Sequence, residues 1–225
     1  MSHKLKLLYV VLIVLAVVAL WPSETERDPS KIRVWKAHVD DAGQLNVLGV
    51  VLGKSTLKEA ETALHSQSER ALFVEMENGE LKRETIEAFF PTSPDRAKII
   101  VELDASDELL TRIKERAYNP MAFPSGNLKL EIAPEHSAEL EQLSARSLTY
   151  IPPVSLDTET IEQQFGAPEK LVRDKDANLH LLYPALGLDV VLPREGKPLL
   201  QFVPPDEFDR LRSLIKVEAD TKGGQ

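Results

Sequence analysis

One stretch of the chain, residues 49–55, ends in the Gly-Lys-Ser letters that close phosphate-binding loops. Such a loop needs four residues between its glycines, so that successive backbone N–H groups can wrap the phosphates. Gly49 and Gly53 are separated by only three residues. We therefore interpret Ser55 or Thr56 as the cap of a helix, and we predict no nucleotide site.

The histidines and carboxylates show no spacing typical of a catalytic or metal site. The sequence has five histidines without an HxH or HExxH pattern, and it lacks a G-x-S-x-G nucleophile elbow. His180 lies among leucines in an expected strand, so we interpret it as structural. Asp40-Asp41, Asp174 and Asp176 fall in expected turns, where solvated carboxylates are common. The sequence thus predicts no catalytic residue, no metal ligand and no cofactor.

Composition excludes several further classes of chemistry. The 225 residues contain no cysteine, which rules out disulfides, thiolate nucleophiles, Cys-ligated zinc and iron–sulfur clusters. The formal charge is −9, and no cluster of Lys and Arg lies beyond the first six residues. Because phosphate contacts need such clusters, we expect no nucleic-acid partner.

Two aromatic residues are the candidates for contact with a partner. Most aromatic residues beyond the N-terminal segment stand one per expected element and are core candidates. Trp35 and Tyr183 instead lie at expected strands or strand ends beside turns, and both residue types are enriched at interface hot spots. We predict that they bind a partner.

The N-terminus carries the longest apolar run of the chain. Residues 7–21 form about fifteen uninterrupted apolar residues, which overlaps the range of signal peptides and is slightly shorter than most spanning helices. Lys4 and Lys6 precede the run and acidic residues follow it. The positive-inside rule then predicts a cytoplasmic tail (1–6), a transmembrane anchor (7–21) and a tether (22–30).

This arrangement predicts a single-pass protein of the inner (cytoplasmic) membrane, with its N-terminus in the cytoplasm and its C-terminal domain in the periplasm. The absence of both cysteine and Asn-x-Ser/Thr sequons agrees with a bacterial periplasm. The alternative is a signal peptide cleaved near Ala19, although bulky Leu20 and Trp21 make that site poor.

The rest of the chain predicts an α+β fold in two related lobes, each a helix plus an antiparallel sheet. The first lobe spans 31–118, the second spans 127–217, and 218–225 form a flexible tail. Residues 118–127, which contain Pro120, Pro124 and Gly126, are expected to link the lobes. In both lobes a capped helix precedes a run of strands separated by turn residues. Residues 130–143 also match 201–214 in their strand, proline and leucine positions, which indicates an internal repeat.

The segment 154–191, VSLDTETIEQQFGAPEKLVRDKDANLHLLYPALGLDVV, resembles the helix-then-meander modules of the SmpA/BamE and β-lactamase-inhibitor-protein type. Residues 48–90 resemble a more diverged copy, and together these segments cover roughly a third of the chain. The resemblance implies an envelope protein that scaffolds or inhibits other proteins through exposed sheet and loop surfaces. The lipobox cysteine of the first family and the disulfides of the second are missing here.

These observations predict a non-enzymatic module, anchored in the membrane, that binds or scaffolds another envelope or membrane protein and contacts the lipid bilayer through its N-terminal helix. Two alternatives stay open. One is a periplasmic or secreted inhibitor released by signal cleavage. The other is a hydrolase with a site assembled by the tertiary structure, which requires a concave pocket lined by convergent polar residues.

Overall fold

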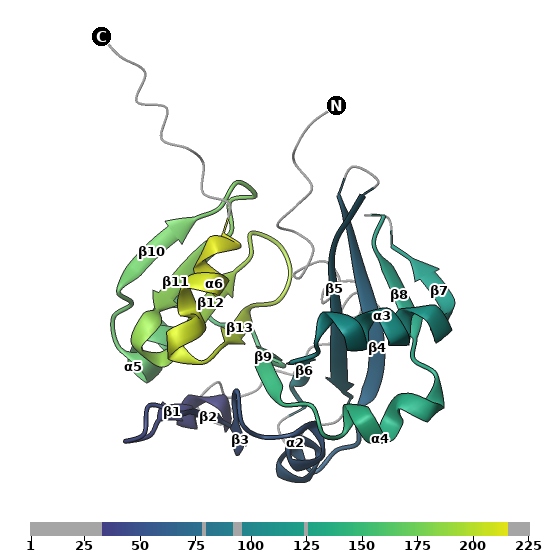
Figure 1. Ribbon diagram of the computed structural model, residues 1–225. Coiled ribbons are helices and arrows are strands. Elements are labelled where there is room, and N and C mark those ends of the chain that lie inside the picture. Colours follow the sequence, from purple (N-terminus) through teal and green to yellow (C-terminus); the bar gives the residue numbers. More distant parts are fainter. Residues whose placement is uncertain (1–32, 78–79, 92–95, 124–125, 216–225) are drawn as a thin grey trace.

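A computed structural model describes residues 33–77, 80–91, 96–123 and 126–215 as an α+β protein with two antiparallel sheets (Figure 1). The small sheet has the order β1 (His38–Val39), β2 (Leu45–Val47), β3 (Val50–Val51). The large sheet has ten strands in the order β10-β11-β12-β13-β9-β6-β5-β4-β8-β7. Its strands are β4 (Glu69–Glu77), β5 (Glu80–Phe90), β6 (Lys98–Leu103), β7 (Tyr118–Ala122), β8 (Leu128–Glu131), β9 (Ala145–Ile151), β10 (Lys170–Arg173), β11 (Leu179–Tyr183), β12 (Leu188–Leu192) and β13 (Leu199–Phe202).

The helices begin at the capping residues that the local sequence provides. The Thr56 hydroxyl oxygen accepts a hydrogen bond from the backbone N–H of Glu59, and the Glu59 carboxylate accepts one from the backbone N–H of Thr56. This capping box starts α2 (Leu57–Leu64). Asp157 caps α5 (Thr158–Phe165) because its side chain accepts a hydrogen bond from the backbone N–H of Thr160. The predicted helix starts near 56 and 157 are confirmed. The other helices are α3 (Asp107–Arg116), α4 (Ser137–Leu140), α6 (Phe208–Ser213) and the 3-10 segments η2 (Arg33–Lys36), η3 (Pro134–His136), η4 (Pro184–Leu186) and η5 (Pro205–Glu207).

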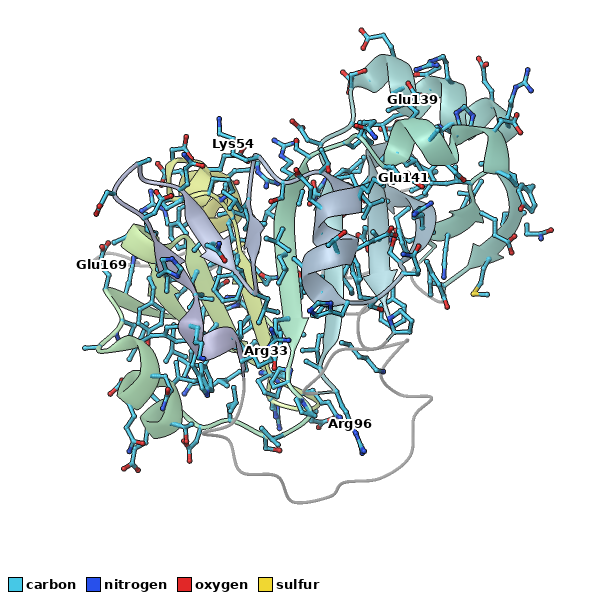
Figure 2. The ribbon with its side chains drawn as sticks, turned by 90° about the horizontal axis from the view of Figure 1, so that it is seen from below. Arg33, Lys54, Arg96, Glu139, Glu141 and Glu169 are labelled. Carbon is cyan, nitrogen blue, oxygen red and sulfur yellow. The ribbon has the colours of Figure 1, made fainter. Side chains whose placement is uncertain are left out.

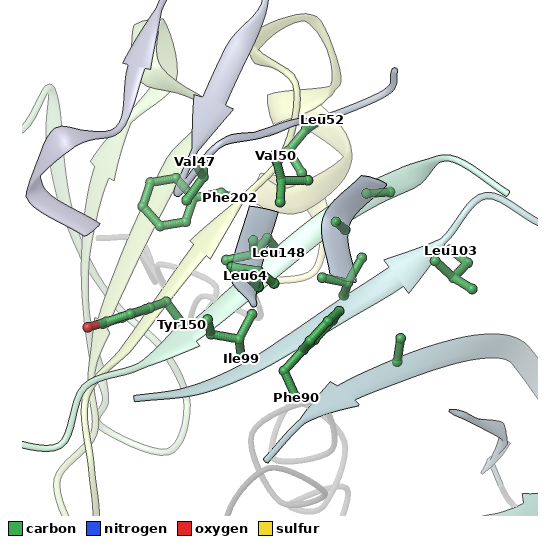
Figure 3. Close-up of a cluster of buried hydrophobic side chains, with 14 of the residues drawn as sticks. Val47, Val50, Leu52, Leu64, Phe90, Ile99, Leu103, Leu148, Tyr150 and Phe202 are labelled. Carbon is green, nitrogen blue, oxygen red and sulfur yellow. The ribbon is translucent and has the colours of Figure 1, made fainter. Parts of the chain in front are cut away.

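One face of the large sheet carries the main hydrophobic core. Leu148 on β9, Phe90 on β5 and Phe202 on β13 are fully buried there. Side chains of the small sheet and of α2 pack onto them, including Val47, Val50 and Leu64 (Figure 3). This packing covers the centre of the sheet, where β13, β9 and β6 lie side by side.

The opposite face of the large sheet is covered over only part of its width. The C-terminal helix α6 packs Phe208 and Leu211 against Val172 and Leu182 of β10 and β11. In Figures 1 and 2, α6 lies on the other side of the sheet from α2 and the small sheet. We call this the second face, and the candidate site lies on it.

The prediction of one antiparallel sheet in each lobe is corrected. The halves of the chain join in one continuous sheet, because β9 pairs with β6 of the first half and with β13 of the second. The order of α2-β4-β5-β6 and α5-β10-β11-β12 is mirrored about the β13–β9 pair. Residues 118–127, expected to link the lobes, contain the edge strand β7 instead. Pro120 is tolerated there because an edge strand leaves one side of its backbone unpaired.

The predicted transmembrane helix is also corrected. In the ranges that the structure describes, no helix is long and apolar enough to span a membrane. The expected tail, anchor and tether, residues 1–30, lie outside those ranges, as does the expected C-terminal tail at 218–225. On this finding we abandon the predicted single-pass location in the inner membrane, together with the bilayer contact that depended on it.

Candidate functional site

A cavity of about 90 Å³ opens on the second face of the large sheet, beside α6. Strand pairing places its residues on one side: Glu87 lies opposite Glu102, and Gln201 lies opposite both Thr149 and Asp189. Polar and charged residues on the wall are Arg83, Glu87, Glu102, Ser147, Thr149, Asp174, His180, Asp189, Gln201 and Arg210. Apolar residues on the wall are Ile100, Val191, Phe202, Val203, Leu211, Leu214 and Ile215.

At one end of the cavity, a buried histidine lies between two buried aspartates. His180 Nδ1 is 2.8 Å from Asp189 Oδ2, and His180 Nε2 is 3.5 Å from Asp174 Oδ2. The exposed fractions are 4% for His180, 1% for Asp189 and 5% for Asp174. Since both ring nitrogens face carboxylates, the arrangement favours an imidazolium that donates to both sides.

Electrostatics agree with a charged ring. Burial alone would lower the pKa of His180, but the hydrogen bond and charge of Asp189, followed by those of Asp174, outweigh it and raise that pKa above its usual value. The pKa of Asp189 is also raised, and here burial is the main cause. The hydrogen bond and charge of His180 lower this pKa, and the charge of Asp174 raises it further. When both carboxylates are ionised and the His180 ring is charged, the three residues together carry a net charge of −1.

A turn between β10 and β11 holds Asp174 in place. Its Oδ1 accepts hydrogen bonds from the backbone N–H groups of Asp176 and Asn178, each at 2.9 Å. Its Oδ2 accepts a third from the Asn178 side chain, also at 2.9 Å. The sequence predicts a solvated turn carboxylate. Lys175 and Ala177 of the turn are indeed exposed, but the Asp174 side chain is buried.

Asp189 is only partly satisfied by its surroundings. Its Oδ2 is bonded to His180, whereas its Oδ1 is buried and has no hydrogen-bond partner among the described residues. Leaving a buried carboxylate oxygen unpaired is costly, and such groups in native proteins usually have a water or ligand partner. A hydrogen-bond donor of a bound ligand would pair the free Oδ1 of Asp189.

The other end of the cavity holds a second charged network. Glu102 Oε1 accepts from Arg83 Nη2 at 2.6 Å, and Glu102 Oε2 accepts from Ser147 Oγ at 3.3 Å. Arg210 on α6 lies 3.9 Å from Glu102 through Nη1 and donates through Nε to Glu207 at 2.9 Å. Its Nη2 is buried without a partner in the part of the chain that the structure describes.

Glu87, on the wall of the cavity, has a pKa well above that of an ordinary glutamate. Burial, reinforced by the neighbouring Glu102 carboxylate, raises the pKa of Glu87 to about 7. A carboxyl group tuned in this way can exchange a proton under physiological conditions.

The geometry does not assemble a hydrolytic triad. Ser147 is hydrogen-bonded to Glu102, and both nitrogens of His180 face aspartates, so no histidine is placed to activate this serine. Within the described ranges, no group of three or more His, Asp or Glu residues could hold a metal ion. What the cavity offers is a bonding site for a ligand with a hydrogen-bond donor.

The two residues predicted to bind a partner lie elsewhere and meet through a third ring. Trp35 on η2 packs edge-on against Phe165 of α5 at 5.3 Å between centroids, and Phe165 lies 5.8 Å from Tyr183. The Tyr183 hydroxyl donates to the carbonyl of Gly166 at 3.0 Å, and its ring is buried. Burial, followed by the charge of Glu162, raises the pKa of Tyr183 to about 12. Their binding role stays a prediction.

Sequence reasoning missed the residues of the cavity. A signal was present in β12, where Asp189 interrupts the apolar run LDVVL, and in β11, where His180 interrupts LHLLY. Charged residues inside strands that are otherwise apolar on both sides indicate a buried polar site. The spacing of 180 and 189 gives no hint that the two side chains meet.

Comparisons with known proteins add no relative: no family model, no curated protein and no solved structure matches this chain. The resemblance to SmpA/BamE and β-lactamase-inhibitor modules therefore stays a prediction.

Proposed function

We propose that this protein is a non-enzymatic binding module that recognises a partner protein through the cavity on the second face of its sheet. One observation carries the proposal: Asp189, 1% exposed, lies on the cavity wall with a carboxylate oxygen that no described residue bonds. A side chain inserted by a partner would supply the missing donor. Deep pockets that receive one anchoring side chain are typical of protein interfaces.

The surroundings of Asp189 support insertion of a side chain. Leu211 of α6, Leu214 at its C-terminal cap and Val191 of β12 provide an apolar wall. Most of the charged groups lie on strands of the sheet, and Arg210 lies on α6. A pocket with apolar walls and few polar groups binds by excluding water and fixes the orientation of its ligand through the polar groups. Rigid strands carry most of these groups, which keeps the loss of conformational freedom on binding small.

The experiment places a photo-crosslinking residue at Gln201, on the cavity wall, and in a separate variant at Lys58, exposed on α2 across the sheet. We expect one defined adduct from position 201 and none from position 58. The captured protein is then purified, and its affinity is measured for Thr149→Arg, which fills the cavity, and for the control Lys58→Glu. Equal adducts from both positions, or unchanged affinity in Thr149→Arg, would refute the assignment.

A hydrolase is the second candidate, and the raised pKa of Glu87 favours it. A carboxyl group with a pKa of about 7 on the wall of a cavity is suited to general acid–base catalysis. The test is a screen of the purified protein against ester, amide, phosphoester and glycoside substrates, with Glu87→Gln as the inactive control. Turnover that disappears in Glu87→Gln while the fold is kept would replace the binding proposal.

A further inference from the structure

We propose that the cavity beside α6 recognises a primary ammonium group carried on a short aliphatic chain, with the ammonium bonded to Asp189 Oδ1. This inference rests on the proposed function and specifies the chemistry of the group that the partner inserts. It also stands on three separate features of the cavity: an unpartnered acceptor, an uncompensated charge and an apolar wall.

A ligand that pairs the free oxygen of Asp189 must carry an N–H or O–H donor. Asp189 Oδ1 is buried, is not bonded by any described residue and belongs to a side chain on the cavity wall. A carboxylate only accepts hydrogen bonds, so an anionic or purely apolar ligand would leave this oxygen unpaired. A quaternary ammonium group, which has no N–H, would also fail to bond it.

The charge balance favours a cationic donor over a neutral one. Asp174 and Asp189 share one imidazolium, that of His180, so this end of the cavity holds one more carboxylate than cations. Neither nearby arginine is bonded to it: Arg83 pairs with Glu102, and Arg210 pairs with Glu207 and faces Glu102. A buried charge is stabilised strongly by a cation held at hydrogen-bond distance.

Bonding geometry and apolarity favour an alkylammonium over a guanidinium. A guanidinium presents a planar fork that matches both oxygens of a carboxylate, whereas Asp189 has only Oδ1 unpaired, which suits the point charge of an ammonium. The side chains of Val191, Val203 and Leu211 can pack along a methylene chain. Such a ligand has a charged end that can bond Asp189 and an apolar stem that can pack against the apolar wall of the cavity.

Two sources can supply this group: a lysine side chain of a partner protein or a free alkylamine. Arg210 Nη2, buried on the wall of the same cavity without a described partner, would donate to a neutral acceptor such as a backbone carbonyl next to an inserted lysine. A free monoamine has no such carbonyl. The two sources therefore differ in the contribution of Arg210.

The experiment titrates the full chain with n-butylammonium, followed by NMR and calorimetry. Its neutral, anionic and donor-free counterparts are n-butanol, n-butyrate and tetramethylammonium. We expect saturable binding of n-butylammonium that is at least about tenfold tighter than that of any counterpart. Equal affinity for n-butanol, or no saturable binding of n-butylammonium, would overturn the inference.

Two pairs of variants locate the site. Asp189→Asn keeps the shape and removes the charge, and we expect a loss of affinity of about tenfold or more. Its control, Asp209→Asn, removes an equal charge from an exposed residue of α6 and should change affinity less than about twofold. If Asp189→Asn fails to fold, Leu214→Lys tests the same point, because it adds a competing ammonium at an exposed residue of the wall. Its control is Leu171→Lys, an exposed leucine of β10 outside the cavity.

A last arm compares the sources with Nα-acetyl-lysine methylamide. Tighter binding than n-butylammonium, reduced by Arg210→Lys, would identify a partner's lysine, whereas equal binding would identify a free amine. The two proposals fail in different ways. A partner that crosslinks to position 201 while n-butylammonium does not bind would disprove the ammonium assignment and leave the binding function intact.

Discussion

The two faces of strand β12 are equally buried and yet differ in chemistry. Leu188 and Val190 point into the main core, while Asp189 and Val191 point to the second face, and all four are almost fully removed from solvent. Burial of apolar side chains stabilises the fold, whereas burial of an incompletely paired carboxylate costs free energy. The core face is therefore built for stability. On the second face, the unpaired carboxylate oxygen of Asp189 lowers the stability of the fold, and a ligand that bonds this oxygen would restore it.

The sharpest test of this contrast uses neighbouring residues of β9. Leu148→Ala removes a fully buried side chain from the core and should lower the free energy of unfolding by about 4 kcal/mol. Thr149→Val, on the second face, should change it by less than about 1 kcal/mol. Urea denaturation of both variants provides the measurement. Similar losses in the free energy of unfolding would show that the second face contributes as much to stability as the core face.

The next effect comes from the buried histidine. His180→Asn takes away the cation between Asp174 and Asp189 and should destabilise the protein by about 3 kcal/mol, because two carboxylates remain buried together. The pKa of His180 is raised on folding, so its contribution is complete below the ordinary value of 6.5 and is lost as pH rises through the folded value. Wild-type stability should thus fall above pH 6.5. A decline of the same size in His180→Asn would assign it to another group.

Glu87 should produce a decline at lower pH. Its pKa is raised from 4.5 to about 7, so the folded state is favoured below pH 4.5 and loses stability as pH rises toward 7. We expect Glu87→Gln to remove this decline and to stabilise the protein at pH 7 by about 1 to 2 kcal/mol. Thermal melts between pH 4 and pH 8 measure the effect. A decline that persists in Glu87→Gln would show that this carboxyl group is not desolvated.

The smallest effect is expected on the core face, at a residue that the sequence suggested for partner binding. Tyr183→Phe deletes the hydrogen bond to Gly166 and leaves the ring in place, which should cost about 1 kcal/mol. Because the ring packs in the main core and does not line the cavity, affinity for n-butylammonium should not change. A loss of partner binding at unchanged stability would instead support the predicted binding role of Tyr183.

Local elements could be predicted because their signals lie within a few residues. The cap of α2 can be recognised from Thr56 with Glu59, and the cap of α5 from Asp157. The strand positions of the second half follow from apolar runs bounded by turn residues. The edge strand β7 was missed since Pro120 suggested a linker. In an edge position a proline costs no ladder hydrogen bond, but edge position is a property of the whole sheet.

The sequence by itself determined the α+β character, the helix starts and the meander strands, since capping and alternation act over one or two turns of chain. Only the tertiary structure decided that the two halves share a sheet and that Glu87, Glu102 and Asp189 face one cavity. The physical reason is strand register: a shift of one residue moves every side chain to the opposite face. That register is set where β9 pairs with β6 and β13, between segments that lie far apart in sequence.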